Sequence, residues 1–334
     1  MSRRNSIILG LLFVILVIEI ITLLPKELGV PSEVTSVPLP QNKQENSGQI
    51  MDHVRAFEAK GNGKEWELWA NKALNPKTNE DWTIEGVRVK FYATSGVIYV
   101  VTGKQGHVVP NEKGIRDIQI SGDVVTRASN GYVFKSQSAL YDSIQKRLTS
   151  PSEVEMISPA DKNGGEMHLT GADLHADFGT NEITINKNVK TIKVLKDNKL
   201  AHIQSDHAKF SGQTKMAEFS GHVVLTMDTM TVTGHEAKFA YDANGEKLES
   251  VLVGGGVKMS DTDRYATSDS VNVNFKDDRV VFKGTPRVTQ NGDELTGDEI
   301  VFLNGGHRVQ VVNAKAQIDS KAVEPDKQNL ERKN

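Results

Sequence analysis

The hexapeptide GHEAKF at residues 234–239 resembles the hexapeptide SDHAKF at residues 205–210. Both end in Ala-Lys-Phe, and their alanines, Ala208 and Ala237, lie 29 residues apart. The histidines, His207 and His235, are one position out of register with each other, so the repeat keeps its apolar residues and varies its polar ones. This pattern indicates a repeated architecture and argues against a duplicated metal or acid/base site.

Similar phrases recur along most of the chain. One small or apolar anchor in each phrase defines a first series with spacings of 33, 33, 35, 34, 29, 34 and 29 residues: Ala73, Gly106, Ala139, Leu174, Ala208, Ala237, Val271 and Ile300. A second series runs out of phase with it, and several of its valines closely follow Gly or Asn: Val87, Val124, Val154, Val189, Val223, Val257 and Val288. Such regularity predicts units that bury their apolar faces by stacking on their neighbours.

The local pattern within the repeats is that of β-strands. Runs such as Val271-x-Val273-x-Phe275 alternate with period two, and Asn-Gly pairs, for example at 130–131 and 291–292, separate many of them. No segment sustains a helical face. We therefore predict an all-β, open, twisted antiparallel β-jelly-roll or solenoid, with about three strands in each unit and on the order of two dozen short strands in all. Its two ends would be unpaired sheet edges.

The N-terminus predicts a membrane anchor. Arg3 and Arg4 precede eighteen apolar residues, Ile7–Leu24, interrupted by one charge at Glu19. A helix of that length spans about 27 Å, close to the hydrocarbon thickness of a bilayer, and the basic residues favour a cytoplasmic N-terminus. A cleaved signal peptide is the alternative. Glu19 would either snorkel to the interface or contact another membrane helix.

Composition divides the chain further. Residues 1–24 form the predicted stub and anchor, residues 25–50 a proline-containing linker, and residues 321–334 a polar, disordered tail. The net charge of −3 disfavours a nucleic-acid partner, and the absence of cysteine excludes disulfides and thiolate metal sites.

The remaining polar motifs do not predict catalysis. Adjacent carboxylates such as Asp293-Glu294 would point to opposite faces of a strand, and metal-ligand spacing and a nucleophile with a positioned base are absent from the sequence. We therefore predict no catalytic residue, no metal and no cofactor. The Gly254–Gly256 run is typical of a bulge or tight bend.

The apolar face suggests a second possibility. It is either an ordinary closed core or a lengthwise slot for hydrocarbon chains, because it is rich in Val, Leu and Met and poor in aromatic residues. By strand parity, the residues predicted to line such a lipid-binding slot are Val87, Val89, Phe91, Val124, Val154, Met156, Val189, Val223, Leu225, Val257 and Met259. A register error of one residue would turn all of them outward.

Residues 51–195 resemble the LptC family of lipopolysaccharide export proteins, in WELWANKA (66–73), VRVKFYATSG (87–96) and MHLTGADLHADFGTNEITINKNVK (167–190). Residues 196–320 resemble LptA and its OstA-like fold, in IQSDHAKFSG (203–212) and VTGHEAKFAYD (232–242). The order of anchor, linker and repeated strand phrases makes this resemblance specific. It implies two jelly-roll units in tandem, as if LptC and LptA had been joined.

The resemblance also implies a function. A groove would hold the acyl chains of lipopolysaccharide, and the lipid would pass from an inner-membrane ABC transporter toward the outer membrane. The protein would be a single-pass inner-membrane protein with its bulk in the periplasm. Its partners would be lipopolysaccharide, the transporter, and an LptA-like or outer-membrane jelly-roll joined by strand augmentation. The alternatives are a membrane-tethered structural or adhesive β-solenoid without lipid cargo and, less favoured, a β-helical polysaccharide-processing enzyme.

Overall fold

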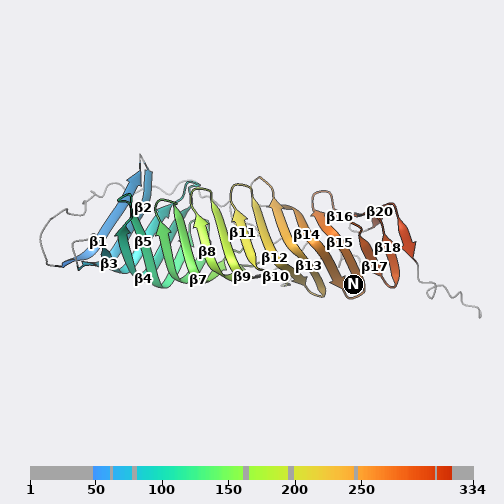
Figure 1. Ribbon diagram of the computed structural model, residues 1–334, viewed down its shortest axis with the longest axis horizontal. Helices are drawn as coiled ribbons and strands as arrows, with labels where there is room; N and C mark the ends of the chain where they lie inside the picture. The colour runs from blue at the N-terminus through green and yellow to red at the C-terminus, as the bar shows by residue number, and fades with distance from the viewer. Residues whose placement is uncertain are drawn as a thin grey trace, which may run out of the picture.

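The computed structural model describes residues 48–60, 63–76, 81–160, 165–194, 199–243, 247–304 and 307–317. Within these residues it consists of antiparallel strands lying side by side across the long axis of the molecule (Figure 1). The strands are β1 (Gln49–Lys60), β2 (Gly63–Asn75), β3 (Trp82–Tyr92), β4 (Ile98–Pro110), β5 (Arg116–Ala128), β6 (Val133–Asp142), β7 (Arg147–Ile157), β8 (Met167–Asp177), β9 (Glu182–Val194), β10 (Leu200–Ser205), β11 (His207–Ser211), β12 (Met216–Met227), β13 (Met230–Tyr241), β14 (Leu248–Asp261), β15 (Arg264–Asn274), β16 (Arg279–Lys283), β17 (Arg287–Gln290), β18 (Asp293–Thr296), β19 (Glu299–Leu303), β20 (Arg308–Val312) and β21 (Lys315–Gln317).

The topology is a meander, in which each strand pairs with its neighbours along the chain. β1 through β9 pair in sequence, and β9 then pairs with both β10 and β11, which together act as one interrupted strand against β12. β16 with β17, β18 with β19, and β20 with β21 are interrupted in the same way. The prediction of an all-β antiparallel fold is confirmed.

The number of strands per repeat was predicted wrongly. One period of about thirty-three residues holds two long strands of 10–14 residues rather than three short ones. Each long strand carries a bend near its middle, where the ladder register shifts, as between Ser121 and Val124 of β5 and between Gly254 and Val257 of β14. Because each strand continues past its bend, two bent strands account for the alternating runs that the sequence pattern assigned to three strands.

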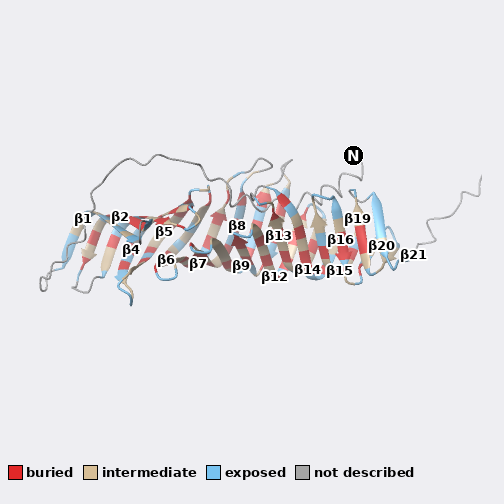
Figure 2. Ribbon diagram, turned by 90° about the horizontal axis from the view of Figure 1, so that it is seen from above, coloured by how far each residue is buried: buried red, intermediate tan, exposed pale blue. Residues whose placement is uncertain are grey.

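The bend divides every long strand into two limbs, which line a common interior. We call the limb that carries the first-series anchors, such as Ala208 and Ala237, limb A, and the limb on the other side of the bend limb B. Tyr141 of limb A packs against Phe91 of limb B with ring centroids 4.4 Å apart, so the limbs face each other across the interior. Buried residues therefore recur as stripes along the molecule (Figure 2).

The first-series anchors form one row on limb A. Ala208 pairs with Ile185 on one side and Phe219 on the other, and Phe219 pairs with Ala237. Small anchors thus alternate with large neighbours, which lets the row fill the interior without overlap. All eight anchors are buried: Ala73, Gly106, Ala139, Leu174, Ala208, Ala237, Val271 and Ile300.

Two of the predicted hairpins are present as expected. Asn130-Gly131 forms the turn between β5 and β6, and Asn291-Gly292 the turn between β17 and β18. Gly131 and Gly292 have φ values of 94° and 91°, which explains the glycine at each turn. The Gly254–Gly256 run is the predicted bulge, with φ of 81° at Gly255 and 80° at Gly256.

Candidate interior conduit

The second-series valines mark the bends. Val124 pairs with Ser136, Ser136 with Val154, and Val154 with Gly171. Toward the other end of the molecule, Val223 pairs with Gly234 and Val257 with Ser268. One residue per strand therefore forms a row, here called the bend row, in which valine alternates with a smaller residue: Val54, Ala70, Val87, Gly103, Val124, Ser136, Val154, Gly171, Val189, Ser205, Val223, Gly234, Val257 and Ser268.

Left-handed backbone places the bend-row valines. The residue just before Val87, Val124, Val189 or Val223 has a positive φ: 63° at Gly86, 50° at Asp123, 54° at Asn188 and 47° at His222. Gly, Asp and Asn tolerate this conformation best among the residue types. This explains why Gly or Asn closely precedes several valines in the sequence.

Two different reasons explain why small residues occupy alternate positions of the bend row. At Gly171, a Cβ atom would lie 2.6 Å from Ile185 Cγ2, so the interior has no space for a side chain. The serines donate instead to a backbone carbonyl two residues further on, with Oγ–O distances of 3.0 Å from Ser136 to Ser138 and 2.9 Å from Ser205 to His207. The repeat thus uses glycine and serine in turn at the same structural position.

The structure places the eleven predicted slot residues in the interior. Val89 and Phe91 of β3 are 0% exposed, and Met259 of β14 is half-buried. The other eight are buried: Val87, Val124, Val154, Met156, Val189, Val223, Leu225 and Val257. They belong to the bend row and to the inward face of limb B, and they extend from β3 to β14.

The interior is closely packed. Two cavities of about 30 and 20 Å³ lie between the limbs near Tyr99 and Phe134, each with room for about one water molecule. The predicted residues therefore meet one another directly, and a hydrocarbon chain would have to separate the limbs to enter.

An aromatic cluster joins the limbs near the N-terminal end. Phe178, which follows β8, lies 5.8 Å from Phe91 and 4.7 Å from Tyr99 between ring centroids. The amide of Thr94 donates to the carbonyl of Phe178 at 3.1 Å. Burial raises the pKa of Tyr99 to about 12. The pKa of Tyr141 is also raised, mainly by burial and to a smaller extent by nearby carboxylates. Sequence reasoning missed this cluster, because its members come from four separate strands and loops.

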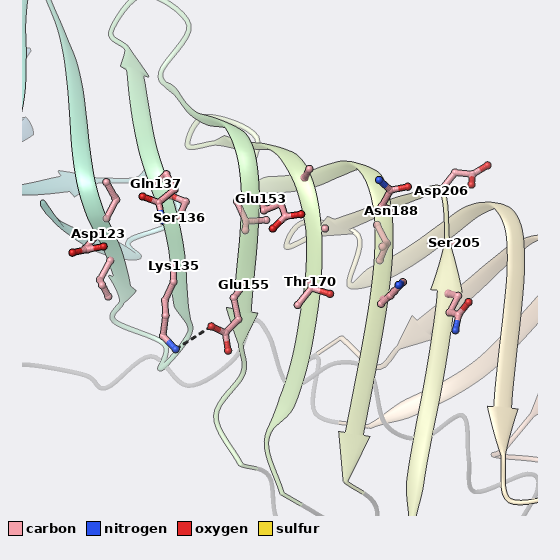
Figure 3. Close-up of a pocket in the computed structure, with 18 of the residues that line it drawn as sticks. Asp123, Lys135, Ser136, Gln137, Glu153, Glu155, Thr170, Asn188, Ser205 and Asp206 are labelled. Atoms are coloured by element: carbon pink, nitrogen blue, oxygen red, sulfur yellow. Dashed lines mark hydrogen bonds and ion pairs between the residues drawn. The ribbon is translucent and has the colours of Figure 1, made fainter.

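A depression with a mixed polar and apolar wall crosses the bends (Figure 3). It has a volume of about 960 Å³ and spans β5 through β10 and β12. Lys135 and Glu155 form an ion pair of 3.0 Å across it, and His222 Nδ1 lies 2.7 Å from Asp206. Its wall mixes acids, bases, amides and hydroxyls with the bend-row residues Val124, Val154, Gly171 and Val189, and it has no concentrated charge of one sign.

The histidines and carboxylates do not converge. His207 and His235, which opened the sequence comparison, are both exposed on their strands. Within the described ranges, His, Asp and Glu form no group of three or more that could hold a metal ion.

The predicted anchor, residues 1–24 with Glu19, lies outside the described residues, as do most of the linker and the tail. Among the residues that are described, no helix has the length and apolar character needed to cross a membrane.

Comparison with known families agrees with this geometry. Residues 11–194 match the family model for lipopolysaccharide-assembly, LptC-related proteins, which is more than half of the chain. The chain belongs to the LptC-related family. Residues 202–304 match a second model, for the LptA/(LptD N-terminal domain) LPS transport protein.

Curated proteins and solved structures were compared with this LptC-related chain as well. No curated protein matches it. Among solved structures it is similar to LptH, the LptA-homologous periplasmic component of the conserved lipopolysaccharide transport device from Pseudomonas aeruginosa. That similarity has 22% identity and a TM-score of 0.31, and covers 35% of this chain and 94% of LptH.

The boundary between the two family matches does not interrupt the sheet. β9 ends the LptC-related match, and β10 begins next to the second match. The two strands pair directly, with Lys193 opposite Ala201 and Val189 opposite Ser205. The bend row and limb B therefore continue from one half of the LptC-related chain into the other.

Proposed function

We propose that this protein is a non-enzymatic, inner-membrane-anchored segment of the lipopolysaccharide transport bridge. Its interior binds the acyl chains and passes them from an inner-membrane ABC transporter toward the outer membrane. The observation that carries the proposal is the apolar bend row, which continues through the boundary between the LptC-related and LptA-like halves. Membership of the LptC-related family supports the cargo and the location in the cell.

The two ends of the sheet support docking by strand augmentation. Within the described residues, β1 pairs with β2 alone and exposes Ile50 and Phe57 at 62% and 44%. At the other end, β19 is the one strand of the described chain that pairs with β20, which exposes Val309 and Val312. Unpaired edges with apolar side chains are suited to adding a strand from another protein. On this proposal, β1 meets the transporter's periplasmic domain, and β20 and β21 meet the next jelly-roll.

Residues 1–24 would be the single membrane helix and residues 25–50 the linker, although β1 already begins at Gln49. Residues 51–195 and 196–320 would act as two jelly-roll units in tandem. Glu19 would lie where another membrane helix can contact it.

A photo-crosslinking pair tests the conduit. A crosslinker at Val223, which points inward, should capture lipopolysaccharide in cells, whereas one at the adjacent Val224 should not, because neighbouring residues of a strand face opposite sides. Phe91 and Lys90 give the same comparison in the LptC-related half. Equal capture, or none, at the inward and outward members of both pairs would rule out an interior path.

The close packing of the interior favours one alternative, a membrane-tethered structural β-solenoid with a dry core. Mass spectrometry of the protein purified from membranes separates the two functions, since a conduit carries bound glycolipid and a dry solenoid does not. Depletion in cells should damage the outer membrane only if the conduit is correct.

A further inference from the structure

One charged residue, a lysine, lies in the mainly apolar inward face of limb B. Lys193 of β9 is 3% exposed, and its pairing partners Met167 and Ala201 are themselves buried. Alternate residues of a strand share a face, so Lys193 points to the same side as Thr191 and the bend-row residue Val189. It therefore belongs to the interior rather than to the outer surface.

Burying an ammonium group is costly unless polar groups surround it. Lys193 Nζ donates to the carbonyl oxygen of Gly165 at 2.8 Å, near the end of limb B. Lys193 thus places a positive charge, through a long flexible stem, at the rim of an apolar interior.

A second polar group lies beside it. Thr191 is 2% exposed, and its Oγ1 is buried without a hydrogen-bond partner among the described residues. The nearby Ser158 differs, because its hydroxyl donates to Pro159 and accepts from the amide of Met167. A buried hydroxyl without a partner costs stability unless a ligand or water satisfies it.

We propose that Lys193 and Thr191 form a binding point for a phosphate group of the transported glycolipid. The ammonium supplies charge and the hydroxyl a further donor, which is the chemistry that phosphate oxygens accept. The position suits a molecule with an apolar part along the bend row and an anionic headgroup at the rim of limb B. It lies where the two halves of the chain meet, and it rests on the proposed function.

The test uses the purified full-length chain and two labelled probes, phosphorylated lipopolysaccharide and the same preparation after enzymatic dephosphorylation. Lys193→Met keeps the length of the side chain and removes its charge, and it should weaken binding of the phosphorylated probe about tenfold. Binding of the dephosphorylated probe should stay unchanged. Thr191→Val should reduce affinity for the phosphorylated probe about threefold, and Lys193→Arg should largely retain it.

Lys190→Met is the matched control, because Lys190 lies on the same strand but is exposed. Equal weakening of both probes by Lys193→Met, or no weakening, would overturn the site and leave Lys193 as a structural cap. Displacement of the phosphorylated probe by inorganic phosphate would assign the site to free phosphate and overturn the headgroup assignment. If Lys193→Met does not fold, unchanged preference for the phosphorylated probe in Thr191→Val overturns the site.

Failure of the proposed function gives a different result. The unaltered protein would then bind neither probe. A protein that binds both probes equally well keeps the conduit and loses only the phosphate site.

Discussion

At the scale of single residues, the bends depend on how much space each position leaves. Gly103 and Gly171 occupy equivalent places in β4 and β8, and at each a Cβ atom would lie within 2.6 Å of an isoleucine methyl group. Neither residue has a positive φ, so their glycine identity reflects close packing rather than backbone strain.

Gly171→Ala should therefore destabilise the protein by about 1–3 kcal/mol, because the added methyl overlaps Ile185 and the carbonyl of Lys187. Denaturant unfolding measures the change. The control is Gly254→Ala, whose added methyl meets only the flexible side chain of Glu236 and should have an effect within about 0.5 kcal/mol. Equal effects at both positions would contradict the packing explanation.

At the scale of elements, the turn after β8 depends on one carboxylate. Asp177 Oδ1 accepts from the amides of Gly179 and Thr180 at 2.9 and 2.8 Å, and Arg147 lies 3.3 Å from Oδ2. Burial acts to raise the pKa of Asp177, but the hydrogen bonds from Thr180, Arg147 and Gly179 outweigh it and lower the pKa below its ordinary value.

A carboxyl whose pKa is lower in the folded than in the unfolded state stabilises the fold at any pH above its unfolded-state pKa. This stabilisation is lost as the pH falls through the folded-state pKa. Asp177→Asn keeps the turn hydrogen bonds and removes the charge, so it should cost about 1 kcal/mol at pH 7 and almost nothing once the pH is well below the folded-state pKa of Asp177. Unfolding measured across pH tests this. Asp269→Asn, on the exposed side of β15, is the control, and a difference that persists in acid would point to lost packing instead.

The contact between limbs depends on the aromatic cluster. Phe178 is 3% exposed and touches the rings of Phe91, Tyr99 and Tyr141. Phe178→Ala should destabilise the fold by about 3–5 kcal/mol and raise hydrogen exchange at the amide of Thr94. Tyr265→Ala is the control, because Tyr265 is 43% exposed. An unchanged exchange rate at Thr94 would show that the backbone bond alone holds the limbs together.

At the scale of the whole molecule, the two halves share one sheet. Ile185 of the LptC-related half is 0% exposed and pairs with both Leu174 and Ala208. In repeat proteins, stability is a sum of unit terms and nearest-neighbour contacts. A loss of packing at the boundary should therefore destabilise the strands on both sides of it.

Ile185→Ala should cost about 2–5 kcal/mol and raise hydrogen exchange in both β7 and β13, on either side of the boundary. Ile300→Ala, an equally buried change near the C-terminal end, should affect β15 and β19 but leave β7 protected. Hydrogen exchange confined to one half after Ile185→Ala would show two independent domains.

The sequence by itself determined the all-β class, the repeat period and the small or apolar anchors that recur with it. Each of these follows from residues close together in the chain: period-two runs, Asn-Gly turns, and the Gly or Asn before a valine. Strand parity also identified inward residues at the bends and on limb B, from Val87 to Met259.

The tertiary structure decided how those strands divide. Ser136 and Ala139 are three residues apart, so simple alternation would place them on opposite faces, yet both line the interior because the bend lies between them. The bend converts three apparent strands into two. The meeting of the limbs at Phe178 and the burial of Lys193 depend on twist and pairing accumulated over many strands. Local sequence does not specify those contacts, because their partners lie far apart in the chain.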